Sequence, residues 1–364
     1  MSTMNAGDGP QDSAVFGAFE VVVPNLSLRY SGVTATNRMI APRVAAMLRT
    51  GWLGRDRPDS VARIGLRELW RIRHASRQGA RPVWHARRNI EIVAGLLLRV
   101  LGWRLAIVFT SAAQREHTAL TRWLIARVDT VIATSASSSS YLRRSATVIH
   151  HGIDPQRYRP PADRAAAWRE GGLSGSFGIG CFGRVRAQKG TDVFVDAMCR
   201  LLPRYRDFTA VVIGEVTPEQ RSFAAKLQAK VDAAGLTDRV VFLGLRPIEE
   251  LPIWFQRISI YAFTSRNEGF GLTLLEAMAA GNALVAARAG AAEVVVADGD
   301  TGVLVPPGDA DALVTALEPL MRDPARAAAM GERARARAVA EFSIDAEAAA
   351  IAQVYRQVRA AAAR

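Results

Sequence analysis

Two carboxylates and two glycines lie close together in residues 266–276, which read Arg-Asn-Glu-Gly-Phe-Gly-Leu-Thr-Leu-Leu-Glu. An apolar β-prone run at 259–265 precedes this stretch, and a helix-forming run at 272–280 follows it. The stretch is therefore expected to connect a buried strand to the beginning of a helix. Free N–H groups at a helix N-terminus attract anions, and Gly269 and Gly271 let a ligand approach the backbone.

Glu268 and Glu276 are the informative members of this stretch. If most of the interval between them is helical, they lie roughly 8–12 Å apart, which is about the span from a sugar ring across a diphosphate to a ribose. Each carboxylate can accept hydrogen bonds from a pair of hydroxyls, and the amides from Gly269 to Leu272 suit phosphate and sugar. The alternative is one surface Glu and one helical Glu at this spacing by chance, because Leu275 belongs to a core-facing side of the helix.

A second segment follows another expected strand, at residues 182–190, which read Phe-Gly-Arg-Val-Arg-Ala-Gln-Lys-Gly. Gly183 permits a tight turn, and Arg184 and Lys189 place two cations at the end of the strand. Cations there would stabilise a leaving diphosphate, which gains negative charge as a glycosidic bond breaks. The alternative is a basic loop at a domain edge.

The pattern Glu268, seven residues, Glu276, preceded 85 residues earlier by Gly183-Arg184, four residues, Lys189-Gly190, resembles the retaining GT-B glycosyltransferases of family 4 (GT4, glycosyl transferases group 1). The resemblance implies an α/β fold with two tandem Rossmann-like, doubly wound parallel-sheet domains and an active site in the cleft between them. It implies that Arg184 and Lys189 stabilise the diphosphate, that Glu268 holds sugar hydroxyls and that Glu276 holds the ribose. The other donor-binding residues that it implies are Gly183, Gly214, Leu245, Arg246, Gly269, Phe270, Gly271 and Leu272.

Residues of the N-terminal half extend the resemblance to bacterial lipopolysaccharide-core mannosyltransferases, through the segments 29–36, 84–89 and 109–115. The resemblance covers nearly the whole chain after residue 17. It implies transfer of mannose from GDP-mannose to a lipid-linked core saccharide, with His117 near the donor sugar or the reaction centre; a structural histidine is the alternative. Gly32 is an acceptor-binding candidate because its loop matches the family's first-strand loop in position, with one glycine where many relatives have two. Further acceptor-binding candidates, chosen on charge and position, are Arg29, Tyr30, Arg87 and Arg88.

Strands and helices alternate through both halves, with a Pro- and Gly-rich boundary at residues 155–175. We expect disorder in 1–17, an acceptor-binding domain in 18–160, a nucleotide-sugar domain in 176–343 and a C-terminal helix in 344–364. Residues 24–37 are expected to form a loop before a helix that begins near Arg38. A basic amphipathic helix is expected at 60–76, with Arg63, Arg67 and Arg71 on one face.

The net charge of +13 belongs wholly to residues 1–164, which contain 24 Arg, no Lys and 11 acidic residues, because the remaining residues contain 23 of each sign. This asymmetry indicates an anionic partner, such as a phosphorylated lipid-linked acceptor or the headgroups of an inner membrane leaflet. An arginine-rich solvated surface is the alternative. No signal peptide or membrane span is predicted, so we expect a cytoplasmic protein, peripheral if it meets a membrane.

No metal or other cofactor is predicted. Asp298 and Asp300 form an Asp-x-Asp pair of the kind that can hold a cation, but they lie in a Gly-rich stretch before the last strand, which favours a structural turn. Cys181 and Cys199 lie in apolar runs without metal spacing, so buried packing in a reducing compartment is expected.

Three other functions remain open. A nucleotide-sugar epimerase has the same two-domain plan but needs acid and base residues at the sugar, and it would consume donor without an acceptor. A glycosyltransferase that uses a UDP- or ADP-sugar would carry the same motifs. A nucleic-acid-binding protein would account for the positive charge, but no basic motif interleaved with stacking aromatic residues is present.

Overall fold

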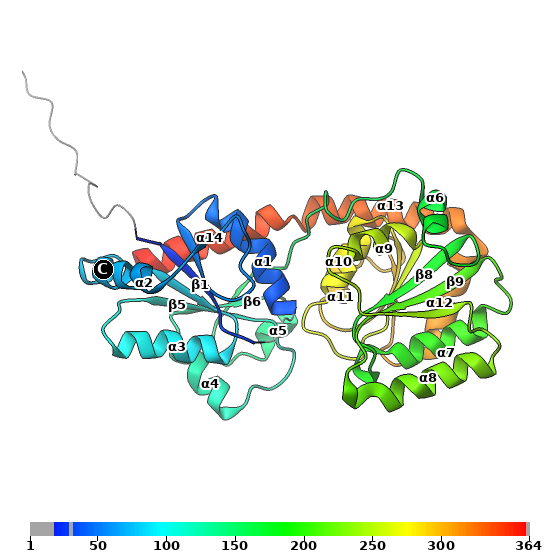
Figure 1. Cartoon of the computed structure of the whole chain (residues 1–364), viewed down its shortest axis with the longest axis horizontal. Helices are drawn as coiled ribbons and strands as arrows, with labels where there is room; N and C mark the ends of the chain where they lie inside the picture. Colours follow the sequence, from blue (N-terminus) through cyan, green and yellow to red (C-terminus); the bar gives the residue numbers. More distant parts are fainter. Residues whose placement is uncertain (1–17, 29–31, 362–364) are drawn as a thin grey trace, which may run out of the picture. The chain divides into compact units, whose positions relative to one another are not determined.

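The computed structural model describes residues 18–28 and 32–361 (Figure 1). The predicted disorder of residues 1–17 and the acceptor candidates Arg29 and Tyr30 lie outside the described residues. Two parallel β-sheets form the framework.

The first sheet has seven strands in the order β3-β2-β1-β4-β5-β6-β7. Its central strands are buried on both faces and largely apolar, as expected of a parallel sheet covered by helices. The strands are β1 Val21–Asn25, β2 Thr50–Gly54, β3 Ala62–Arg63, β4 Val83–Ala86, β5 Ala106–Ser111, β6 Thr130–Ala133 and β7 Thr147–Val148. The helices between them are α1 Gly32–Ala45, α2 Leu66–Arg77, α3 Asn89–Val100, α4 Ala119–Ile125 and α5 Ala136–Ser140.

The second sheet has six strands in the order β10-β9-β8-β11-β12-β13. They are β8 Phe177–Phe182, β9 Phe208–Ile213, β10 Val240–Gly244, β11 Ile260–Phe263, β12 Ala283–Ala287 and β13 Val303–Val305. The accompanying helices are α6 Arg164–Glu170, α7 Thr191–Leu201, α8 Arg221–Ala233, α9 Leu251–Arg257, α10 Leu272–Ala279, α11 Ala292–Val295, α12 Ala310–Arg322, α13 Pro324–Glu341 and α14 Ile344–Ala360, with 3₁₀ turns at Ala187–Lys189 and Pro218–Gln220.

Helices cover the second sheet through two separate apolar cores. One core includes Phe194 and Leu317, and the other includes Phe255 and Leu274. Strand order reverses between β8 and β11, so the loops that follow these two strands lie at a topological switch point, where open α/β sheets bind ligands.

The chain divides into two compact units whose limits differ from those of the sheets. One comprises the chain up to Thr110, Thr118–Ile132 and the residues from Ala348 onwards; the other comprises Ser111–His117 and Ala133–Glu347. The C-terminal part of α14 packs in the first unit, where the Tyr355 hydroxyl lies 2.5 Å from Nδ1 of His85. A guanidinium nitrogen of Arg81 also donates to the Val358 carbonyl at 2.9 Å.

Two local expectations are wrong, and one strand was missed. Helix α1 begins at Gly32 rather than near Arg38, and the Thr36 hydroxyl donates to the Gly32 carbonyl at 2.9 Å within its first turn. Arg63 lies in β3, opposite Trp52 of β2, so it does not share a helical face with Arg67 and Arg71. Strand β2, which contains Gly51 and Gly54, was not predicted from the sequence.

Candidate active site

The two loops at the switch point of the second sheet are joined by hydrogen bonds. The backbone N–H of Arg266 donates to the Gln188 carbonyl at 2.8 Å. The Gln188 side-chain amide donates to the Asn267 carbonyl at 3.2 Å, and the Thr264 hydroxyl donates to the Lys189 carbonyl at 3.0 Å. The loop after β8 and the loop after β11 are therefore held in one fixed arrangement.

A close backbone approach and an ion pair reinforce this arrangement. Gly190 has a φ of +66°, and a Cβ atom there would lie 1.9 Å from the Thr264 carbonyl oxygen, so a larger residue does not fit. The Arg266 guanidinium binds both oxygens of Asp192, at 2.7 and 2.8 Å. Such two-point pairs fix geometry as well as charge.

Lys189 and Glu268 meet within this frame. The Lys189 ammonium forms an ion pair with Oε2 of Glu268, and the Ser265 hydroxyl donates to the same oxygen at 3.4 Å. Both charged side chains are largely buried, with 23% and 21% of their surface exposed. The structure thus brings together two residues that are 79 positions apart and were predicted to act on the same donor.

The turns after β8 and β9 also pack closely. A Cβ atom on Gly214 would lie 1.8 Å from the Gly183 carbonyl oxygen, so only glycine fits at position 214. Beside these turns, Nε of Arg184 lies 3.6 Å from a carboxylate oxygen of Glu215, and both side chains are about half exposed. A solvent-exposed pair of this kind contributes little to stability, so a phosphate can compete for Arg184.

Helix α10 begins directly after the Glu268 loop. Its N-cap residue Gly271 has a φ of +99°, which favours glycine. No side chain caps this N-terminus among the described residues. Uncapped N–H groups and the positive end of the helix dipole suit a phosphate. Phe270 and Leu272, on either side of Gly271, are buried and half-buried respectively.

Glu276 lies one turn further along α10, and its carboxylate accepts a hydrogen bond from the Tyr158 hydroxyl at 3.0 Å. Burial raises the pKa of Glu276 to about 7, while the Tyr158 hydroxyl and the positive charge of Arg157 oppose this rise. Tyr158 is itself 1% exposed and packs edge-on against Phe255. Sequence reasoning missed Tyr158, because it lies in the Pro- and Gly-rich segment that was interpreted as a domain boundary.

The segment Ser111–His117 belongs to the same compact unit as these loops. The Gln114 side-chain amide donates to the Gly269 carbonyl at 3.2 Å, and a Cβ atom on Gly269 would lie 2.9 Å from the Ala112 carbonyl oxygen. His117 ends this segment and is half-buried. The segment that carries His117 therefore reaches the loop that carries Glu268, and the role of the imidazole stays a prediction.

The remaining donor candidates follow β10. Leu245 is 72% exposed. Arg246 is half-buried, and within the described part of the chain its Nε atom has no hydrogen-bond partner. Both stay predictions for the donor site.

The acceptor candidates that the structure describes lie at the other sheet's switch point, between β1 and β4. The Arg88 guanidinium donates to Glu91 and Asn25 at 2.9 Å each and to Thr34 at 2.8 Å. Arg88 therefore serves at least to tie three segments of the chain together. Arg87 is half-buried, and Gly32 is exposed at the beginning of α1.

The Asp298–Asp300 pair lies in a turn, and each carboxylate has an arginine partner. Asp298 accepts from Arg288 at 3.0 Å and from the Leu304 backbone at 2.9 Å, and Asp300 accepts from Arg333 at 2.6 Å. Across the described residues, no group of three or more His, Cys, Asp or Glu side chains could hold a metal ion. Whether the reaction needs a metal stays a matter for prediction.

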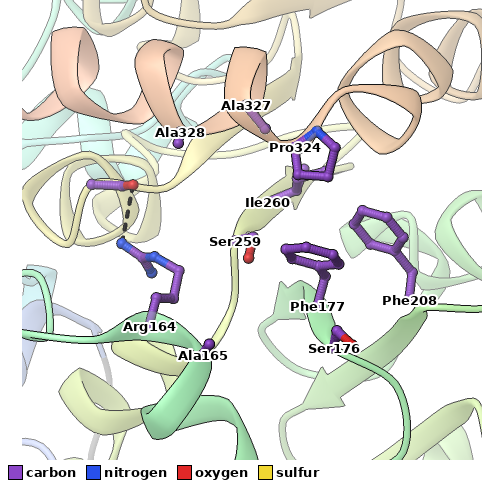
Figure 2. A pocket seen from close by; sticks show the side chains of 11 residues that line it. Arg164, Ala165, Ser176, Phe177, Phe208, Ser259, Ile260, Pro324, Ala327 and Ala328 are labelled. Carbon is purple, nitrogen blue, oxygen red and sulfur yellow. Dashed lines mark hydrogen bonds between the residues drawn. The ribbon is translucent and has the colours of Figure 1, made fainter.

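A pocket lies at the opposite end of the same sheet from the switch point, where the strands begin (Figure 2). Phe177, Phe208 and Pro324 line it and make it mainly apolar. The Arg164 guanidinium at its edge donates to the carbonyls of Ile258 and Ala280, at 2.5 and 2.7 Å, and so closes the C-terminal ends of α9 and α10. Arg164 is the one charged residue among the described residues that line this pocket, whereas the switch point brings together Arg184, Lys189 and Glu268.

Comparison with known proteins identifies the class. The model of the family "Glycosyl transferases group 1" matches residues 170–337, which include both switch-point loops and α10. The chain belongs to this family and is a glycosyltransferase, and its two parallel sheets have the GT-B fold.

Particular relatives are similar along nearly the whole chain. The lipopolysaccharide core biosynthesis mannosyltransferase LpcC of Rhizobium leguminosarum bv. viciae is 46% identical over 341 residues, which cover 93% of this chain and 96% of the relative. LpsB of Rhizobium meliloti, which has the same description, is 42% identical over 93% of this chain and 97% of its own length. Anabaena Alr3699/HepE, solved in complex with UDP and glucose, has a TM-score of 0.77 at 22% identity and covers 92% of this chain and 99% of its own, which shows the fold.

Proposed function

We propose that this glycosyltransferase is a mannosyltransferase of lipopolysaccharide-core biosynthesis, which transfers mannose from GDP-mannose to a lipid-linked core saccharide with retention of configuration. The observation that carries the proposal is the 46% identity to a core mannosyltransferase over 93% of the chain. Similarity of that extent includes the N-terminal half, which lies outside the donor motifs. In a two-domain transferase that half is expected to bind the acceptor, so similarity there supports a similar acceptor.

The donor is assigned to the switch point of the second sheet. The diphosphate would lie on the uncapped N-terminus of α10, between the amides that follow Glu268 and the cations of Arg184 and Lys189. Glu276 would accept hydrogen bonds from the ribose, and Glu268 from mannose hydroxyls. Gly183, Gly214 and Gly269 lie in the turns where the nucleotide would approach, and at Gly214 and Gly269 the missing side chain lets neighbouring turns pack closely around it.

The chemistry of these groups suits departure of a diphosphate. As the bond from the sugar to the phosphate breaks, negative charge grows on the phosphate oxygens, and fixed cations and amides lower the energy of that state. Because Lys189 is held by the Thr264 hydroxyl at its carbonyl and by Glu268 at its ammonium, its charge needs little rearrangement at that moment. The acceptor oxygen forms the new bond to the anomeric carbon, and its proton passes to an oxygen of the departing diphosphate, as the resemblance to retaining transferases implies.

The direct test is transfer of labelled mannose from GDP-mannose to purified lipid-linked core saccharides that lack their mannose. We expect GDP release that depends on acceptor, and an α-linked product detected by NMR. Donor consumption without acceptor would indicate an epimerase or a hydrolase instead. Transfer from UDP- or ADP-sugars, with GDP-mannose inert, would keep the family and overturn the donor.

A further inference from the structure

Helix α3 of the first unit exposes apolar side chains on its outer side. Ile90, Val93, Leu97 and Val100 follow each other at intervals of three or four residues, which places them on one face. Each is about half exposed or more, and Val100 reaches 84%. The opposite side of the helix is buried through Ile92 and Gly95. Helix α3 is thus apolar both on the side that packs on the sheet and on the side that faces solvent. A helix that is apolar all round is normally buried, so the exposed side is expected to contact another surface.

The neighbouring helices continue this surface. Helix α4, which contacts α3, exposes Leu120 and Trp123, and the Arg127 guanidinium lies 3.7 Å above the Trp123 ring. In Figure 1, α3 and α4 lie together on the side of the first sheet away from α1 and α14. The Arg99 guanidinium donates to the Arg127 carbonyl at 3.2 Å, which joins the ends of α3 and α4.

Helix α2 lies near the C-terminal end of α3 and exposes Trp70, at 64%. The Arg73 guanidinium lies 5.1 Å from the Trp70 ring and 4.9 Å from the Trp103 ring, and it donates to the Leu101 carbonyl at 3.4 Å. Exposed apolar groups and tryptophans flanked by arginines therefore extend over α2, α3 and α4. We call this region the Trp–Arg face.

The positive charge of this region favours an anionic partner. Residues 60–132 contain 13 Arg, no Lys and four acidic residues. Two of those four are neutralised: Glu91 is buried against Arg88, and Asp129 pairs with both Arg81 and Arg99. Guanidinium groups bind phosphate oxygens at two points, tryptophan prefers the interface between lipid and water, and basic amphipathic helices bind anionic bilayers.

We propose that the Trp–Arg face binds the surface of an anionic phospholipid bilayer, with the apolar side of α3 inserted among the acyl chains near the headgroups. No helix among the described residues has the length and apolar character to cross a bilayer, so this contact would be a peripheral one. It is not the helical face that was expected to carry Arg63, Arg67 and Arg71, because Arg63 is in β3 and most of the exposed apolar side chains come from α3 and α4. The inference goes beyond the proposed function, and vesicle binding can be tested without donor or acceptor.

The test is flotation of the full chain with phosphatidylcholine vesicles that contain or lack phosphatidylglycerol. We expect binding to the anionic vesicles, weak binding to the neutral ones, and release by salt. The double variant Leu97→Glu, Val100→Glu should lose at least about tenfold in vesicle affinity, because it places charge on the inserted side. Arg127→Gln, which removes the guanidinium beside Trp123, should lose about fivefold.

Val339→Glu is the matched control, because Val339 on α13 is 45% exposed in the second unit and should leave vesicle binding unchanged. All variants should keep the circular dichroism and nucleotide binding of the parent. Absence of binding to anionic vesicles, equal binding to neutral ones, or full binding by the double variant would overturn the proposal. A dimer that the double variant dissociates, without vesicle binding, would assign the face to a second copy of the chain instead.

Discussion

The ammonium of Lys189 and the carboxylate of Glu268 occupy the switch point of a sheet in a transferase whose leaving group is expected to be a diphosphate. Lys189→Met keeps most of the side-chain volume and removes the charge. We expect kcat to fall by about 10²–10³-fold, as is typical when one charge-stabilising group is removed from a reaction centre. Steady-state release of GDP measures the effect.

Lys230→Met is the control for that substitution, since Lys230 also pairs with a carboxylate, Asp196, but on the exposed surface of the same unit. It should retain the parent's kcat. Wild-type kcat in Lys189→Met would contradict the role assigned to the ammonium.

The raised pKa of Glu276 predicts that donor binding depends on pH. Only the ionised carboxylate accepts two hydrogen bonds from ribose hydroxyls, and burial places its pKa at about 7. Donor affinity should therefore decrease as the pH is lowered through this value. Tyr158→Phe removes a hydrogen bond that favours the ionised form, so the midpoint should move to higher pH.

Binding isotherms of GDP across the pH range measure that midpoint, and Glu276→Gln should remove the dependence. The same shift predicts a stability effect without ligand. Because the folded state holds the proton more tightly than the unfolded state, stability should decrease as the pH rises from about 4.5 to about 7. A donor affinity that is constant over this range would show that Glu276 does not meet the ribose as a carboxylate.

At the scale of elements, the contact between the two switch-point loops depends on Gly190. An alanine in the left-handed region costs about 1 kcal/mol wherever it occurs, and at position 190 its Cβ would also collide with the Thr264 carbonyl oxygen. Gly190→Ala should lower the Tm and weaken donor binding at least about tenfold, because the loops that carry Lys189 and Glu268 must separate.

Gly235→Ala provides a matched comparison, since Gly235 has the same φ of +66° but no atom within 4 Å of its Cβ position. Gly235→Ala should lower the Tm only by the cost of an alanine in the left-handed region, and it should keep the parent's donor affinity. Equal effects of the two substitutions on binding would mean that the close approach at Gly190 does not position the loops.

Local pattern was enough to predict the strand, loop and helix around Glu268, because an apolar run, glycines and helix formers are all contiguous there. β11, Gly271 and α10 follow the expected order. The partners of that loop were beyond local pattern. Arg266 pairs with Asp192, 74 positions away, and Tyr158 reaches Glu276 from 118 positions away. Charge alone likewise selected Arg88 without revealing its contacts with Asn25, Thr34 and Glu91.

At the scale of the whole molecule, the last helix belongs to two units of the chain. Glu347 binds His151 at 2.8 Å in the second unit, whereas Tyr355 is buried against His85 in the first. Tyr355→Ala should destabilise the first unit by about 3–5 kcal/mol, as loss of a buried aromatic side chain does. The second unit should keep its stability.

Calorimetry of Tyr355→Ala should then resolve two thermal transitions. The transition of the first unit should move to lower temperature, and GDP should still stabilise the transition of the second unit. Tyr355→Phe is the milder control, which removes only the hydroxyl that contacts His85. A single transition that shifts as one would show that the units unfold together.

The restriction of the net positive charge to residues 1–164 was apparent from the sequence, but the surface that carries it was not. The spacing of Arg63, Arg67 and Arg71 fits one face of a helix. In the structure Arg63 is the last residue of β3, and α2 begins only after Gly65, so Arg63 is not part of the helix. The exposure of Val93, Leu97 and Val100 also required the structure, because an apolar helix of this length is usually expected to be buried.

The most direct test of the central claim is calorimetric titration of the purified chain with GDP-mannose, GDP, UDP and ADP, in the parent and in Glu276→Gln. The account predicts that GDP and GDP-mannose bind selectively and that Glu276→Gln weakens both. Selective binding of UDP or ADP, or guanine-nucleotide binding that Glu276→Gln leaves intact, would contradict it.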